Sequence, residues 1–332
     1  MKYPWHEAEL VRVLAARATL HHALLIEGPP GIGKQDFALG LAAALLCEAS
    51  DAAGRACGAC LACGWFAQGS HPDFRWLRPE AKDPDFVARK DRKPSRHIRV
   101  EQIRTIASFV NIGAHRAGRK IVLIEPAETM NNVSANALLK TLEEPAGNTV
   151  FLLVCGHPDA LPATVRSRCR RLALAPPPAA GAAEWLAATA GIDAAEAATW
   201  VAAAGGAPLL AQRLAEPVGA TAHRTVLETL ARFPDIAVVD AAASLHQFDA
   251  DAWIPVVRAW ATDLARVLGG APPRFLPGER ARLEVLAKKT SLERVLRLEA
   301  DLAATAVATE QPLNPRLLAE GVMLRCCEAF EP

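Results

Sequence analysis

Short, mostly apolar runs alternate in the first half of the chain with longer segments in which apolar residues recur every three or four positions. The runs lie at 24–26, 120–125 and 149–154, and a shorter one falls within 71–77. A short apolar run bounded by turn residues predicts a buried strand, and the longer periodicity predicts an amphipathic helix. The first half is therefore predicted to be an α/β domain, with helices at 3–20, 37–46, 98–110, 131–142 and 163–171.

The second half of the chain is predicted to be helical throughout. A proline-rich linker at 175–178 leads into an alanine-rich segment, 179–214, which is typical of a small helical bundle. Helical periodicity then recurs at 221–233, 237–247, 251–268, 278–287, 291–307 and 315–330. Trp253 and Trp260 share one face of such a helix, which predicts a place in the core. The predicted domains are residues 1–172, 173–214 and 215–332.

The run LLIEGPPGIGKQ at 24–35 joins a predicted strand to a predicted helix through a glycine-rich turn. Gly28, Gly31 and Gly33 allow backbone angles that turn the N–H groups of the loop inward, and the helix adds its positive N-terminal end. Lys34 adds a charge for the outer phosphates of a nucleotide. The spacing G-x-x-x-x-G-K in this context is the pattern of a P-loop, so ATP or ADP is a candidate ligand. A glycine-rich turn that binds nothing is the alternative.

Several positions depart from what nucleotide hydrolysis requires. Gln35 stands where a Ser or Thr hydroxyl would bind the magnesium ion, and a longer amide is a poor substitute. The strand at 120–125 ends in Glu125-Pro126, so Glu125 can organise magnesium but Pro126 has nothing with which to polarise water. Cys155-Gly156 follows the next strand, where a polar side chain would sense the γ-phosphate. The sequence therefore predicts that the loop can hold phosphate but that the chain itself hydrolyses little or no ATP.

Four cysteines follow the P-loop helix closely. Cys47, Cys57, Cys60 and Cys63 have the spacing C-x9-C-x2-C-x2-C. The short gaps let neighbouring thiolates converge on one ion, and the long gap brings in the ligand at the end of the helix. Four thiolates suit a closed, structural zinc site rather than a catalytic one. Reduced thiols without a ligand, or an iron–sulfur cluster, are the alternatives.

Charge and targeting signals restrict the possible functions. The chain has 332 residues and a net charge of +1, which argues against a protein that grips nucleic acid through bulk charge. A local basic stretch within 83–99 could contact a phosphate backbone or be a solvated loop. Its basic residues are Arg89, Lys90, Arg92, Lys93, Arg96 and Arg99. No signal peptide and no membrane span are evident, which predicts a cytoplasmic protein.

Two further runs carry a specific resemblance. SANALLKTLEEP at 134–145 and LPATVRSRC at 161–169 resemble the signature of clamp-loader subunits of the AAA+ family, as in bacterial DNA polymerase III. The four-cysteine insertion after the P-loop helix is similar to that of bacterial clamp loaders. The resemblance implies an AAA+ P-loop domain with a zinc-module insertion, a small helical lid domain and an all-α collar domain through which subunits associate. Its motifs cover roughly residues 20–175.

The resemblance also implies a role for one arginine. Ser167-Arg168-Cys169 matches the S-R-C motif, whose arginine reaches the γ-phosphate of ATP held by a neighbouring subunit. Such a finger in trans stabilises charge in the transition state, so a subunit can lose its own hydrolysis and keep this residue. A surface charge on a helix is the alternative for Arg168.

The implied partners are the other clamp-loader subunits, tau/gamma and delta, within the DNA polymerase III holoenzyme, a DNA-directed DNA polymerase and nucleotidyltransferase. The sliding clamp and primed DNA are implied through the assembled complex. The departures at Gln35, Pro126 and Cys155 favour a rigid, non-hydrolysing subunit over the ATP-hydrolysing tau/gamma type. An active tau/gamma-like ATPase and a zinc-containing DNA-binding module are the competing interpretations.

Overall fold

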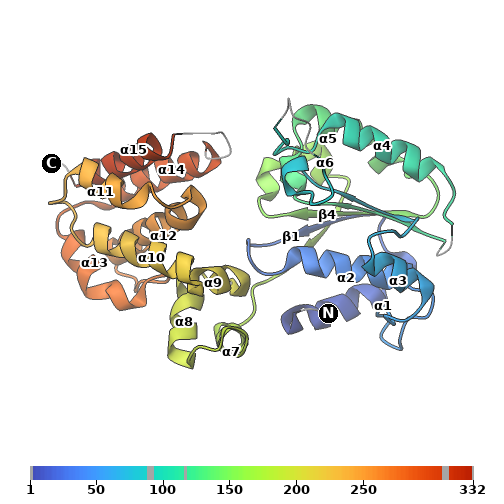
Figure 1. The fold of residues 1–332 in the computed structure, drawn as a ribbon, viewed down its shortest axis with the longest axis horizontal. Helices are drawn as coiled ribbons and strands as arrows, with labels where there is room; N and C mark the ends of the chain where they lie inside the picture. Colours follow the sequence, from blue (N-terminus) through green and yellow to red (C-terminus); the bar gives the residue numbers. More distant parts are fainter. Residues whose placement is uncertain (1–2, 88–92, 116–117, 309–313, 331–332) are drawn as a thin grey trace. The chain divides into compact units, whose positions relative to one another are not determined.

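The computed structural model describes residues 3–87, 93–115, 118–308 and 314–330. The chain divides into two compact units, Met1–Pro176 and Pro177–Pro332 (Figure 1). Each unit has its own hydrophobic core. The predicted division of the second half at residue 214 stays a prediction.

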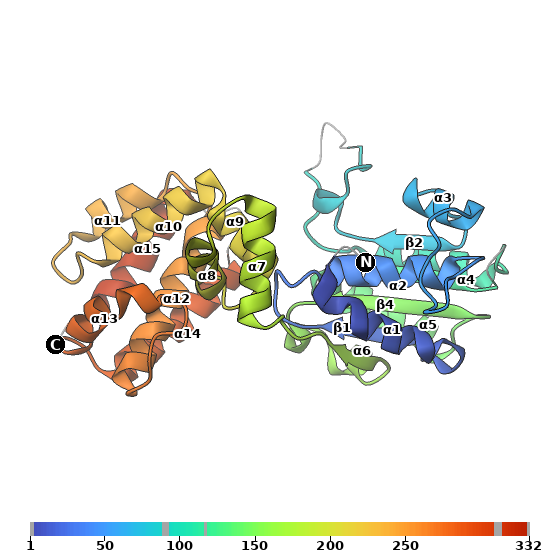
Figure 2. The ribbon, with the colours of Figure 1, turned by 90° about the horizontal axis from the view of Figure 1, so that it is seen from below.

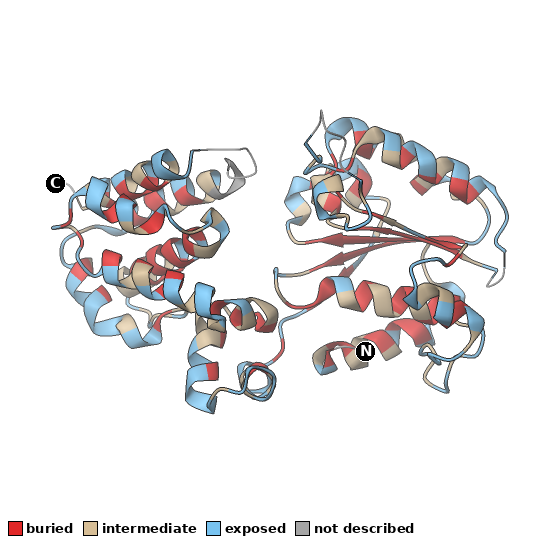
Figure 3. Ribbon diagram, viewed as in Figure 1, coloured by how far each residue is buried: buried red, intermediate tan, exposed pale blue. Residues whose placement is uncertain are grey.

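The first unit contains a five-stranded sheet in the order β2-β3-β4-β1-β5, and all of its strand pairs are parallel. The bounds of the strands are β1 Ala23–Glu27, β2 Phe74–Leu77, β3 Lys120–Ile124, β4 Thr149–Cys155 and β5 Arg170–Ala173. Every residue of β1, β3 and β4 is buried, as expected for strands covered on both faces (Figure 3). The predicted α/β class is confirmed.

Helices cover the two faces of this sheet, as Figures 1 and 2 show. On one face lie α1 Glu7–Ala15 and α2 Lys34–Leu46, with α3 Leu61–Ala67 next to α2. On the other face lie α4 Val100–Asn111, α5 Asn132–Glu143 and α6 Ala163–Arg166. Inward residues of α4 and α5, such as Ile106 and Leu138, pack against β3 and β4 residues in one buried cluster. Short 3-10 helices lie at Pro4–His6, Arg17–Thr19, Glu80–Lys82, Ala127–Thr129 and Pro158–Ala160.

Two expectations for this unit are corrected. The helix predicted at 3–20 is divided into two 3-10 turns and α1, because Pro4 starts a separate turn and the backbone leaves helical geometry at Ala16. The helix predicted at 163–171 ends at Arg166, and the chain continues into β5, which the sequence analysis missed. Leu172 of β5 is buried while its neighbours are exposed, so β5 shows the alternation of an edge strand rather than an apolar run.

The second unit is all helical. Helices α7 Ala179–Ala190, α8 Ala194–Ala203 and α9 Pro208–Ala215 share a small cluster centred on Leu186 and Val201. A larger cluster joins α10 Pro217–Leu230, α11 Val238–Leu245, α12 Ala250–Leu268, α13 Arg280–Ala287, α14 Leu292–Ala308 and α15 Pro315–Glu328, and the 3-10 helix Pro277–Glu279 precedes α13. Trp253 and Trp260 are 1% and 3% exposed within it, so their predicted core role is confirmed.

A buried carboxyl group ties the loop after α12 to that helix. Both oxygens of Asp263 accept backbone N–H groups, from Arg274 at 2.6 Å, Phe275 at 2.9 Å and Leu276 at 2.7 Å. Asp263 is fully buried. The same loop places the Phe275 ring where a Cβ added to Gly205 would lie 2.8 Å from it. Asp263 therefore holds the loop on α12, and Phe275 of that loop packs against the turn between α8 and α9.

Replacing Asp263 is expected to destabilise the second unit strongly. Asp263→Asn removes the charge and leaves one acceptor oxygen for three donors, and hydrogen bonds to charged groups contribute about 1.5–3 kcal/mol each. We expect a loss of about 2–4 kcal/mol in the free energy of unfolding, measured by urea denaturation. The control, Asp301→Asn on the exposed face of α14, should change it by less than about 0.5 kcal/mol. Equal effects of the two variants would contradict this account.

Candidate functional site

The glycine loop follows β1, an interior strand of the sheet. It runs from the end of β1 to Gly33, which precedes α2 in a left-handed conformation (φ +87°). Gly28 lies very close to the segment that follows β5 in the same chain. A Cβ added to Gly28 would lie 2.4 Å from the carbonyl oxygen of Leu174. The predicted strand, loop and helix are therefore present. Gln35 is exposed at the start of α2.

The N-terminal segment packs against this loop. The carbonyl oxygen of Ile32 accepts a hydrogen bond from Trp5 Nε1 at 2.9 Å and another from His6 Nε2 at 2.7 Å. Tyr3 stacks on Trp5, with ring centroids 5.0 Å apart. A Cβ on Gly33 would lie only 2.5 Å from the Tyr3 ring. The sequence analysis missed this contact, because nothing local links residues 3–6 to the loop.

Lys34 faces its own loop and a group of acidic residues. Its Nζ donates a hydrogen bond to the carbonyl oxygen of Pro29 at 2.8 Å. Burial lowers the pKa of Lys34, and the nearby Glu128, Cys155 and Glu125 oppose that shift. The lysine is thus near the expected phosphate position, but in this structure its ammonium group is engaged by the protein.

Glu128 occupies the place where a phosphate sensor was expected. Its Oε1 accepts a hydrogen bond of 2.8 Å from the backbone N–H of Gly156, directly after β4. Glu125, the acid assigned to magnesium from the sequence, has its pKa raised by burial, which favours the neutral form. A γ-phosphate at Gly156 would therefore meet a carboxyl group instead of a free donor. The sequence analysis chose Glu125 from its place at the strand end and gave Glu128 no role.

Arg168 lies at the end of the sheet where the strands begin, and the glycine loop lies at the end where they finish. It is in the turn between α6 and β5, and Arg170 at the start of β5 pairs with Leu24 at the start of β1. The glycine loop begins only after Glu27, at the far end of the same strand. Three strand residues span roughly 10 Å. The arginine is therefore far from the nucleotide loop of its own chain.

The turn that carries Arg168 is anchored in the protein. Cys169 packs against the buried cluster under α4 and α5, and burial raises its pKa to about 11, so the thiol stays protonated. The Arg168 side chain keeps 33% of its surface exposed. The neighbouring arginines point to other partners: Arg166 pairs with Asp159 at 2.7 Å, and Arg171 pairs with the buried Glu27 at 2.6 Å.

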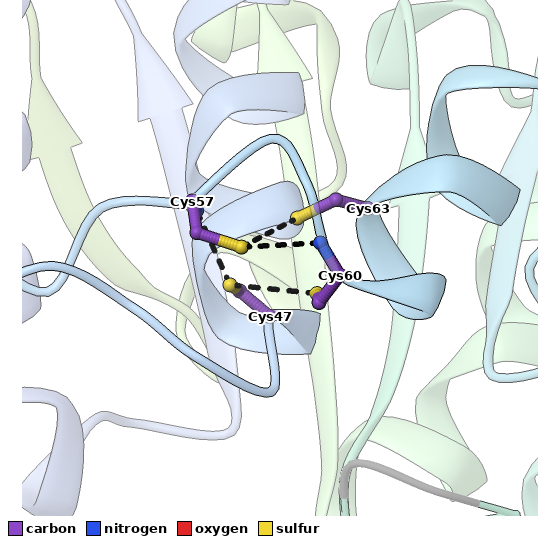
Figure 4. A group of neighbouring side chains, drawn as sticks. All are labelled: Cys47, Cys57, Cys60 and Cys63. Atoms are coloured by element: carbon purple, nitrogen blue, oxygen red, sulfur yellow. Dashed lines mark hydrogen bonds between the residues drawn. The ribbon is translucent and has the colours of Figure 1, made fainter.

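The four predicted cysteine ligands converge (Figure 4). The sulfur atoms of Cys47, Cys57, Cys60 and Cys63 all lie within 4.8 Å of one another, with Cys47–Cys60 at 3.9 Å and Cys57–Cys63 at 4.0 Å. A tetrahedral ion with metal–sulfur bonds of 2.3 Å requires sulfur atoms about 3.8 Å apart. Backbone N–H groups point at the thiols and lower the pKa of Cys60 to about 6. The cluster can therefore hold a metal ion.

The remaining sequence expectations concern charge and membranes. In the basic stretch, Arg89, Lys90 and Arg92 lie outside the described residues. Arg99 caps α4 and lies 3.8 Å from a carboxyl oxygen of Glu80, so it has a structural role. None of the helices in the described part of the chain combines the length and apolar character that crossing a bilayer requires.

Comparison with known proteins gives the family. Residues 6–178, slightly more than half of the chain, match the family model described as "DNA polymerase III, delta subunit". The chain belongs to this family. The matched range covers the glycine loop, the cysteine cluster and the S-R-C turn.

Individual relatives agree with the family. Over 213 residues, 64% of this chain and 61% of that protein, the chain is 48% identical to DNA polymerase III subunit delta' of Pseudomonas aeruginosa. It is 37% identical over 186 residues to the subunit delta' of Escherichia coli, covering 55% of this chain and 52% of that protein. Subunit tau of Salmonella typhimurium is 35% identical over 150 residues, 45% of this chain and 21% of tau. The chain thus spans about half to six-tenths of the delta' relatives.

The contact between Tyr3 and Gly33 can be tested by substitution. Gly33→Ala forces a left-handed alanine, which costs about 1–2 kcal/mol, and drives its methyl group into the Tyr3 ring. Gly147→Ala is a matched control, because Gly147 has φ +60° but no atom within 4 Å of an added Cβ. We expect Gly33→Ala to lower the free energy of unfolding by at least about 1 kcal/mol more than Gly147→Ala.

A double variant isolates the clash. In Tyr3→Ala/Gly33→Ala the ring is gone, so the combined loss should be smaller than the sum of the single losses. Strictly additive losses would mean that the ring does not lie against the loop.

Proposed function

We propose that the chain is a delta-prime-type subunit of a bacterial DNA polymerase III clamp loader, which hydrolyses little or no ATP itself and offers Arg168 to the ATP site of a neighbouring subunit. The observation that carries the proposal is the placement of Arg168. It is partly exposed in an anchored turn, at the end of the sheet opposite the glycine loop. An arginine so placed is out of reach of its own loop and open to another chain.

The state of the chain's own loop supports the same role. Gln35 offers an exposed amide where magnesium needs a short hydroxyl ligand. Glu128 already accepts the N–H of Gly156, and Pro126 replaces the residue that would polarise water. Each change weakens a different part of phosphoryl transfer, so restoring one would not restore the others. We propose that ATP or ADP binds this degenerate loop only weakly. The residues that would contact it are Gly28, Gly31, Gly33, Lys34 and Gln35.

The role requires partners. We infer that the chain works in a hetero-oligomer with tau/gamma and delta subunits, where ATP bound by neighbours drives loading of the sliding clamp onto primed DNA. The all-helical second unit is the proposed lid and collar. An active tau-like ATPase is the second candidate, favoured by the 35% identity to tau over 150 residues. It requires that Gln35 and Glu128 be compatible with turnover.

The arginine proposal is tested in the assembled loader. Arg168→Ala should reduce ATP turnover stimulated by clamp and primed DNA, because fingers in trans contribute about 10³–10⁵ to the rate at the site they serve. Arg104→Ala, at an exposed arginine on α4 away from this turn, is the control and should leave turnover unchanged. Unchanged turnover with Arg168→Ala, or equal losses in both variants, would remove the assigned role.

We propose zinc as the ion held by Cys47, Cys57, Cys60 and Cys63. Four thiolates leave no coordination position for water, so the site is structural. Bound zinc would order the segment between α2 and β2, with apparent binding free energies on the order of 10 kcal/mol for such sites. The segment includes only two buried apolar side chains of α3, Ala62 and Cys63, so the metal would supply what packing does not.

Metal analysis of the purified chain tests this assignment. The intact protein should contain about one zinc per chain, and Cys60→Ser should lose most of it, because three thiolates bind zinc more weakly than four. Cys327→Ser, a half-buried cysteine of α15, should keep its zinc. Finding iron with sulfide, or no metal in protein prepared without chelators, would contradict the zinc assignment.

A further inference from the structure

Arg168 is held by three groups of its own chain, the carboxylate of Glu143, the carbonyl oxygen of Thr164 and, at 3.4 Å, the hydroxyl oxygen of Ser167. Its Nε donates a hydrogen bond of 2.7 Å to Oε1 of Glu143, and its Nη2 is in ion-pair contact with the same oxygen. Its Nη1 donates to the carbonyl oxygen of Thr164 at 2.8 Å. The guanidinium group is therefore oriented from two sides before any neighbour arrives.

These contacts leave part of the guanidinium available. A guanidinium has five N–H groups, arranged so that Nε and Nη2 form one edge and the two terminal nitrogens form another. Glu143 takes the Nε–Nη2 edge, and Nη1 donates to the carbonyl oxygen of Thr164 and, at 3.4 Å, to the hydroxyl oxygen of Ser167. Within the described part of the chain, the second hydrogen of Nη2, on the edge between the terminal nitrogens, has no acceptor. A phosphate oxygen is an acceptor that suits such a charged donor.

Glu143 is itself well placed by the fold. It is the last residue of α5, and the preceding Leu142 is fully buried. The carbonyl oxygen of Leu142 accepts a hydrogen bond of 2.8 Å from Nε2 of His22, which lies just before β1. An open cavity of about 370 Å³ adjoins the pair and is lined by residues that include His21, His22, Ser167 and Arg170. The carboxyl group thus stands on a helix end that is tied to the residue just before β1.

We propose that Glu143 is a positioning residue for Arg168: it holds the guanidinium so that the remaining N–H of Nη2 can donate to the γ-phosphate of a neighbour. The inference rests on the proposed role of Arg168 and extends it to a second residue. Exposed ion pairs contribute little to folding stability, so the consequence of removing Glu143 lies in orientation. A freely rotating arginine must be ordered when the neighbour docks, which lowers the rate at that site.

The test uses the reconstituted clamp loader with full-length chains and measures ATP turnover with clamp and primed DNA. The turnover lost in Arg168→Ala defines the Arg168-dependent part. Glu143→Ala should remove at least half of that part through kcat, with the KM for ATP unchanged, because the neighbour's nucleotide pocket is intact. Glu143→Gln keeps an oxygen acceptor of the same reach and should retain most of it. Glu144→Ala, the exposed neighbour in sequence, should behave as wild type.

The double variant Glu143→Ala/Arg168→Ala should turn over ATP no more slowly than Arg168→Ala alone, because Glu143 acts only through the arginine. If Arg168→Ala changes nothing, the proposed function fails. If Arg168→Ala slows turnover but Glu143→Ala does not, only the positioning role fails. Faster turnover with Glu143→Ala would mean that the carboxyl group restrains the arginine. Equal losses in Glu143→Ala and Glu143→Gln would mean that the charge of Glu143, and not the orientation of Arg168, matters. Either result overturns the inference.

Discussion

The parallel pairing of β1 with β4 on one side and β5 on the other is the constraint on which the functional geometry depends. Because all strands run the same way, the loop after β1 and the end of β4 meet at the carboxyl ends of the strands. The turn that enters β5 lies at the amino ends of the strands, beside the start of β1. The glycine loop and Arg168 are therefore separated by the length of a buried strand. A single chain cannot bring the two together without breaking the sheet.

This separation explains how one domain can keep half of an ATPase mechanism. The edge that holds the glycine loop is altered by an exposed amide, a partly buried Glu125 and the hydrogen bond between Glu128 and Gly156. The opposite edge keeps an anchored turn, a half-exposed guanidinium and a carboxyl group that accepts a hydrogen bond from it. Changes at one edge leave the other intact, since the buried strands between them are rigid. The proposed loss of hydrolysis and the proposed service of Arg168 to a neighbour are thus structurally independent.

Local patterns in the sequence predicted much of this. The glycine loop, the apolar strands β3 and β4 and the four converging cysteines each depend on residues close together in the chain, and all were found from spacing alone. The β5 strand was missed because its two arginines and single buried leucine resemble a charged helix end. The Tyr3 ring on Gly33, the Glu128–Gly156 hydrogen bond and the Glu143–Arg168 pair were also missed. Each joins residues that only the tertiary fold brings together, and sequence spacing carries no signal for such contacts.

The most direct test of the central claim is ATP binding and hydrolysis by the purified chain alone, in the presence of magnesium. The account predicts no turnover above background and weak or undetectable binding, because Gln35, Pro126 and Glu128 each remove a different part of the hydrolytic site. Clear turnover that Lys34→Ala abolishes would contradict it. Such a result would mean that the loop works despite these residues, and that the chain is an ATPase in its own right.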